Sequence, residues 1–175
     1  IADGHHRYET ACNYKDFLAE EEHLDSEHPA NFVLMQCVGM NDPGLLVLPT
    51  HRLFRGVPSM TSQELQGKLG NCFRLESFGS GPELAASAWE KIEVEGEQGQ
   101  LGFYTAQDNT WTLASVTPAG LDKLAQLAPE HSSDWQGLGV SILHRLVMEN
   151  LLGLTNLPKP MYVHSVAEVI EGLQR

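Results

Sequence analysis

The chain begins with Ile1-Ala2-Asp3-Gly4-His5-His6-Arg7, a stretch that predicts the first structural elements of the fold. Its first two residues are typical of the end of a buried strand, the next two form a turn, and a helix is expected from His5 to about Glu22. The first turn of a helix has unpaired backbone N–H groups and the positive end of the helix dipole. A strand, a turn and a helix start in this order predict a site for phosphate or carboxylate.

The charges in the first helical turn favour the same interpretation. Without a ligand, each cation at a helix start costs about 0.3–1 kcal/mol, yet His5, His6 and Arg7 all lie there. A bound anion would remove this cost, Arg7 would supply a planar two-pronged donor, and Gly4 would allow close approach. The alternative is a helix that Asp3 caps and whose histidines are solvated, which needs no ligand.

A second candidate region is Pro49-Thr50-His51-Arg52. Pro49 is expected to end a strand, because proline cannot donate to a central ladder. Ligand sites often gather at strand ends, so His51 and Arg52 are candidate ligand contacts. The alternative interpretation, that these residues form an exposed loop without a ligand, is equally well supported by the sequence. His144 lies on an apolar helical pattern and could face a ligand, but a packed, hydrogen-bonded histidine is the favoured interpretation.

Composition limits the function classes. The 175 residues are 42% hydrophobic and 19% charged, as in soluble globular proteins, and contain no apolar run of membrane-spanning length and no signal peptide. We therefore expect a cytoplasmic protein with no membrane partner. The formal net charge of −12 opposes nucleic-acid binding, but one local basic pocket is enough for a small phosphorylated ligand.

The apolar periodicity predicts an α+β fold with mixed, mostly antiparallel sheets and helices packed on them. Because Ile1 falls inside a motif, the chain is expected to be a fragment of a longer protein. Residues 1–175 are expected to form one domain, or the central part of a larger one, with a subdivision near residues 57–60. The expected strands are Phe32–Val38, Leu45–Leu48, Cys72–Phe78, Leu101–Ala106, Thr110–Val116 and Met161–His164. Helices are expected from Thr61 or Ser62, over Pro82–Glu93, Pro118–Leu127 and Ser141–Leu152, and after Ser165.

Three blocks of the sequence, Ile1–Ala11, Leu48–Arg52 and Val140–Leu146, resemble the bacterial and archaeal family called domain of unknown function 1015. This resemblance implies no assigned activity. The family pattern has Asp where this chain has Gly139, so no role of that Asp is carried over.

The turn and the following helix also resemble the phosphate-binding box of the ParB and sulfiredoxin superfamily, which includes free-serine kinases. That likeness covers about ten residues. It implies a ParB/sulfiredoxin-like strand, turn and helix at the N-terminus that hold nucleotide phosphates.

These observations lead to a first hypothesis, an enzyme that handles a nucleotide or a phosphorylated small metabolite. The expected phosphate-binding residues are Gly4, His5, His6, Arg7 and Arg52, and the expected catalytic residues are Asp3, His5 and His51. The serine-kinase likeness implies Asp3 as the base and Mg²⁺ bound with the nucleotide. A nucleotide hydrolase is a close variant.

Two other function classes are a non-catalytic sensing module and a metal-binding protein. A non-catalytic module that senses a nucleotide or anion would need the turn and Arg7 but no base. Histidines 5, 6, 51 and 164 could ligate a metal ion, but adjacent helical residues point about 100° apart, so no metal site is predicted.

Overall fold

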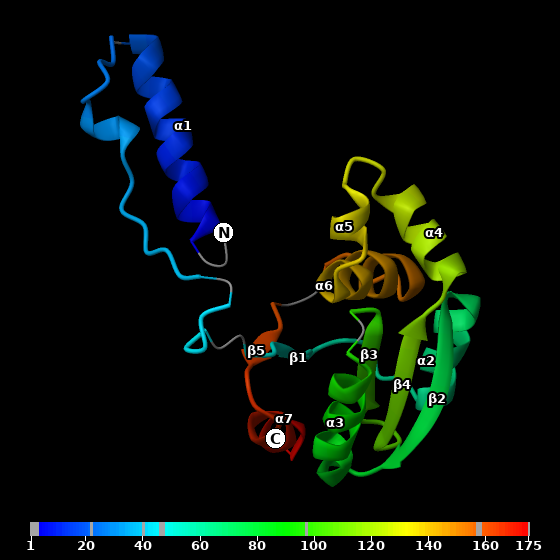
Figure 1. The fold of residues 1–175 in the computed structure, drawn as a ribbon. Coiled ribbons are helices and arrows are strands. Elements are labelled where there is room, and N and C mark those ends of the chain that lie inside the picture. The colour runs from blue at the N-terminus through cyan, green and yellow to red at the C-terminus, as the bar shows by residue number, and fades with distance from the viewer. Residues whose placement is uncertain are drawn as a thin grey trace. The chain divides into compact units, whose positions relative to one another are not determined.

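The computed structural model describes residues 4–21, 23–39, 41–45, 48–96, 98–156 and 159–174, which form two compact units, residues 1–47 and 48–175 (Figure 1). The expected strand end at Ile1-Ala2 and the turn residue Asp3 lie outside the described residues. The subdivision expected near residues 57–60 stays a prediction.

The first unit contains the predicted helix, α1 (His5–Glu21), and the short 3-10 helix η1 (Pro29–Asn31). The expected strand over Phe32–Val38 is wrong, because these residues form no strand ladder, and Leu34 is 100% exposed. A strand needs a neighbour for its backbone groups, and among the described residues none pairs with this run.

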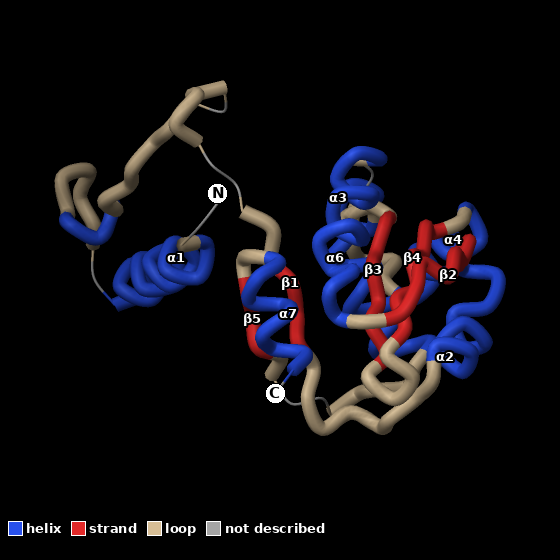
Figure 2. Tube along the Cα trace, turned by 90° about the horizontal axis from the view of Figure 1, so that it is seen from below, coloured by secondary structure: helices blue, strands red, loops and turns tan. Residues whose placement is uncertain are grey.

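The second unit is built on a three-stranded antiparallel sheet, with strand order β2-β4-β3 (Figure 2). The strands are β2 (Phe73–Ser80), β3 (Gln100–Thr105) and β4 (Thr110–Val116), close to the predicted ranges. The β3–β4 hairpin turns at Asn109, which has a positive φ of 51°. A register shift between Ser77 and Gly79 marks a bulge in β2.

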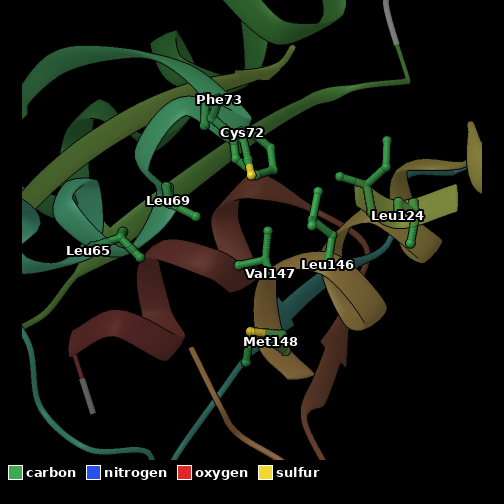
Figure 3. Close-up of a cluster of buried hydrophobic side chains, with 10 residues drawn as sticks. Leu65, Leu69, Cys72, Phe73, Leu124, Leu146, Val147 and Met148 are labelled. Carbon is green, nitrogen blue, oxygen red and sulfur yellow. The ribbon is translucent and has the colours of Figure 1, made fainter. Parts of the chain in front are cut away.

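Helices cover both faces of this sheet. On one face, α2 (Ser62–Leu69), α4 (Pro118–Leu127) and the π-helix η4 (Ile142–Leu151) share a hydrophobic cluster with Ala114 of β4 (Figure 3). On the other face, α3 (Ala85–Glu95) packs with Trp111 and Leu113. The alternation along β4 therefore separates two cores.

A separate two-stranded ribbon completes the second unit. It pairs β1 (His51–Leu53) with β5 (Met161–Val163), and Val163 packs with α7 (Val166–Gln174) and α3 in the second cluster. Shorter elements are η2 (Gly70–Cys72), η3 (Pro82–Leu84), α5 (Ser133–Gln136) and α6 (Gly139–Ser141). The predicted α+β class with antiparallel sheets is confirmed. Within the described residues, no helix combines the length and the apolar character needed to span a membrane.

Asp108, in the β3–β4 turn, ties the sheet to the start of α2. Its Oδ2 accepts hydrogen bonds from the Ser62 N–H at 2.8 Å and the Ser62 hydroxyl at 2.6 Å, and its Oδ1 accepts one from the Thr105 hydroxyl at 2.6 Å. The hydrogen bonds from Ser62 and Thr105 lower the pKa of Asp108 to about 2.

We predict that Asp108→Asn lowers the free energy of unfolding at neutral pH and that the deficit shrinks in acid. The folded-state pKa is about 2 and the unfolded value about 3.9, so this carboxylate stabilises the fold above pH ~4 and loses its contribution as the pH falls toward 2. Urea unfolding from pH 7 to 3, followed by tryptophan fluorescence, measures this, with Asp122→Asn on the exposed side of α4 as control. A deficit that is constant with pH would contradict the prediction.

Two helical glycines predict opposite effects of the same substitution. An added Cβ at Gly120 of α4 would overlap the backbone oxygen of Cys72, whereas one at Gly67 of α2 would meet nothing within 4 Å. Gly120→Ala should therefore destabilise the second unit by about 1–3 kcal/mol, and Gly67→Ala should stabilise it by about 0.5–1 kcal/mol. Chemical unfolding followed by tryptophan fluorescence tests both, because Trp89, Trp111 and Trp135 all lie in this unit.

Candidate functional site

The start of α1 combines a left-handed glycine with a basic side chain folded back over it. Gly4 has φ +78°, and its carbonyl oxygen accepts the Tyr8 N–H at 2.9 Å. A Cβ placed on Gly4 would lie 3.1 Å from the Arg7 Nη2, so the guanidinium lies against the glycine. The turn therefore brings a cationic fork to the helix start.

The neighbouring histidines place two imidazole rings beside the Arg7 guanidinium at the helix start. The rings of His5 and His6 lie 4.2 Å apart, both residues are exposed, and the first turn of α1 contains no acidic residue. Glu9 follows, with its Oε2 at 3.8 Å from the His6 Nδ1. Gly4, His5, His6 and Arg7 thus lie together as expected.

A shallow concavity of about 750 Å³ lies toward the other end of α1 and is not a phosphate site. Its charged lining is mostly acidic, with Glu20, Glu21 and Asp25 against Lys15. A phosphate group would meet like charges there. The electrostatics of the first unit favour the α1 start for an anion.

In the second unit, His51 begins strand β1, so it lies inside a strand and not beyond its end as the sequence suggested. Its ring contacts the Trp89 ring edge-on at 4.9 Å, and its Nε2 is shielded from solvent without a hydrogen-bond partner among the described residues. Burial lowers the pKa of His51, and the nearby His164 and Arg52 charges lower it further. His51 is therefore neutral at pH 7.

Arg52 lies on the opposite face of the ribbon. Its guanidinium carbon is 5.5 Å from the centroid of the Tyr162 ring, its cross-strand partner, and its Nη1 donates to the Thr50 carbonyl oxygen at 3.0 Å. Its Nε is buried and, among the described residues, has no acceptor. Such a donor costs about 1–3 kcal/mol when unpaired. Adjacent strand residues point to opposite faces, so His51 and Arg52 are presented to different surroundings.

His144, on the π-helix, packs beside Phe54, which follows Arg52 by two residues in the chain. Its half-buried ring packs at 6.5 Å from the Phe54 ring, which agrees with the packed histidine expected from sequence. Burial lowers the pKa of His144, the Arg52 charge lowers it further, and Glu149 raises it. The sequence pattern did not indicate this proximity to Arg52, because the two residues are far apart in the chain.

The histidines considered as metal ligands fall in different units. His5 and His6 belong to the first unit, while His51 and His164 belong to the second, where the His164 Nδ1 lies 3.1 Å from the Pro49 carbonyl oxygen. Among the described residues, no group of three His, Cys, Asp or Glu side chains is arranged to hold a metal ion.

A cavity of about 230 Å³ lies between α3 and the β2-β4-β3 sheet. Its charged lining residues are Arg74, Glu76, Lys91 and Glu95, and the Lys91 Nζ lies 2.6 Å from the Glu76 Oε1. The opposite charges compensate one another inside the second unit. The cavity therefore has little electrostatic preference for an anion.

The lowered pKa values of His51 and His144 predict a pH-dependent stability of the second unit. Below the ordinary histidine pKa near 6.5, both histidines take up a proton more readily in the unfolded chain than in the folded one. The free energy of unfolding should therefore fall as the pH falls from 6.5 toward 5. The double variant His51→Gln, His144→Gln should flatten this fall, whereas His131→Gln should not. Guanidinium unfolding at pH 7.5 and 5.5 measures it, and an unchanged slope in the double variant would contradict it.

Comparison with known proteins identifies the family of the chain. No curated protein and no solved structure gives a significant match to the chain. A family model described as "Protein of unknown function (DUF1015)" matches residues 1–152, a range that contains the α1 start, the β1 strand and the π-helix. The chain therefore belongs to the DUF1015 family of proteins of unknown function.

Proposed function

We propose that the turn formed by Asp3 to Arg7 binds the phosphate of a nucleotide or of a phosphorylated small metabolite. The observation that carries this proposal is the Arg7 guanidinium, which lies against Gly4 at the start of a 17-residue helix whose first turn lacks acidic residues. An anion there would meet the helix dipole, the backbone N–H groups and a planar donor together.

The reaction that suits this arrangement is phosphoryl transfer to a small serine-like hydroxyl, with nucleotide hydrolysis as its variant. Asp3 would accept the proton of the attacking hydroxyl, while His5 and His6 would stabilise the charge on the transferred phosphoryl group. Mg²⁺ would come with the nucleotide and neutralise its phosphates.

Ligand-induced stabilisation tests the binding step. A thermal-shift screen of the protein with ATP, ADP, CTP, phosphoserine and inorganic phosphate should find at least one stabilising ligand, by about 2.7 kcal/mol at 100 times its Kd. Calorimetry should then find that Arg7→Gln weakens that ligand by about tenfold or more, because a charge-assisted bidentate contact is lost.

Lys15→Gln is the matched control, since it removes one positive charge from the same helix away from the turn. It should leave the affinity within about twofold of the wild type. Equal losses in both variants would mean that only overall charge matters.

For a stabilising nucleotide, Asp3→Asn then separates the two function classes: turnover lost with binding kept identifies an enzyme, and binding without turnover in either protein identifies a sensing module.

A further inference from the structure

We propose that Arg52 and His144 form a second oxyanion site, on the face of the β1–β5 ribbon that looks toward the π-helix. It would accept a phosphoryl or carboxylate group through the Arg52 fork. This site lies wholly in the second unit and does not depend on the function proposed for the α1 turn.

The unused edge of the Arg52 guanidinium has the geometry that oxyanions require. Its Nη1 is occupied by the Thr50 carbonyl oxygen, and the Tyr162 ring supports its plane. The remaining edge carries Nε and Nη2, the two parallel donors that grip carboxylate and phosphate in a bidentate manner. The buried Nε has no acceptor among the described residues. A bound oxyanion would provide one.

The charges around Arg52 are not balanced by a described carboxylate. The ion pairs among the described residues involve Lys91, Arg145 and surface histidines, and Arg52 takes part in none of them. The Arg52 charge lowers the pKa of His144, so the two side chains interact electrostatically. Glu149, on the same helix as His144, already pairs with Arg145, whose Nη1 lies 2.6 Å from the Glu149 carboxylate. An oxyanion bound at the Arg52 fork would accept an N–H of the neutral His144 ring and would offset the Arg52 charge that disfavours protonation of that ring.

The backbone that carries His144 is itself unusual. Residues 142–151 form a π-helix, and its end is closed by a bond from the Leu152 N–H to the Val147 carbonyl oxygen at 2.9 Å. Helical turns of this kind are rare and occur frequently at functional sites, because they shift side chains away from their α-helical positions. The π-helix carries the His144 ring that packs on Phe54, two residues after Arg52. The rare helix geometry and the Arg52 Nε that has no acceptor among the described residues are therefore independent observations on the same region.

Histidine-resolved NMR of the full chain, labelled at the histidine Cε1 carbons, tests this site. At constant ionic strength set with chloride, addition of inorganic phosphate or of acetate should move the His144 signal in a saturable way, and the effective anion identifies the ligand group. The His144 pKa should be higher with the anion bound than in chloride, because the anion favours the imidazolium form. His144→Gln assigns the signal.

Arg52→Lys keeps the charge but removes the fork, and it should weaken the effective anion by at least about tenfold. Two control variants should leave the titration of His144 unchanged. Arg145→Lys makes the same change next to His144, where the Arg145 side chain pairs with Glu149, and Arg7→Gln removes the site proposed at the start of α1. The signal of His131, which stacks on Trp135 at 3.8 Å, reports that each variant is folded. No saturable shift with either anion, or an unaltered titration in Arg52→Lys, would overturn the proposal.

Discussion

Burial of the π-helix in the first hydrophobic cluster is the constraint on which the second unit depends. Leu146 and Val147 are 0% exposed and pack with Leu69 of α2 and Leu124 of α4, as Figure 3 shows. Burial of each such side chain contributes about 1.5–3 kcal/mol, so the helix cannot rotate without losing several such contributions. Because the helix is fixed by its apolar side, the position of His144 beside the ribbon is fixed as well.

Much of the fold of the second unit could be predicted from the sequence because local signals agreed with the tertiary structure. Thr61 caps α2 in a capping box with Glu64, and Pro118 occupies the first turn of α4 behind the Thr117 cap. The β3–β4 hairpin was visible from two alternating runs around a polar turn. In these places the residues that start and stop an element are adjacent in the chain, so no knowledge of distant contacts is required.

Other features depend on partners that periodicity does not identify. The run Phe32–Val38 has strand composition, but composition does not supply a neighbouring strand. The apolar spacing of residues 142–151 predicts an α-helix, and nothing in that spacing indicates the wider turns of the π-helix that is observed. The strand expected over Leu45–Leu48 would leave His51 and Arg52 together beyond its end, whereas β1 contains both and places them on opposite faces. Residues 46 and 47 of that expected strand lie outside the described residues. Strand β1 by itself separates the two side chains that sequence reasoning had grouped.

One signal in the sequence could have indicated the ribbon site. A His-Arg pair occurs at residues 6–7, 51–52 and 144–145 of an otherwise acidic chain, and the last two pairs contribute Arg52 and His144 to one face of the second unit. The net charge of −12 repels anions at long range, but salt at physiological strength screens exposed charges beyond about 8 Å. An anion close to a rigid donor therefore experiences the donor more strongly than the distant carboxylates. In such a chain, affinity for an anion depends on donors that packing holds in place, and the Tyr162 ring and the buried π-helix hold the two donors at the ribbon.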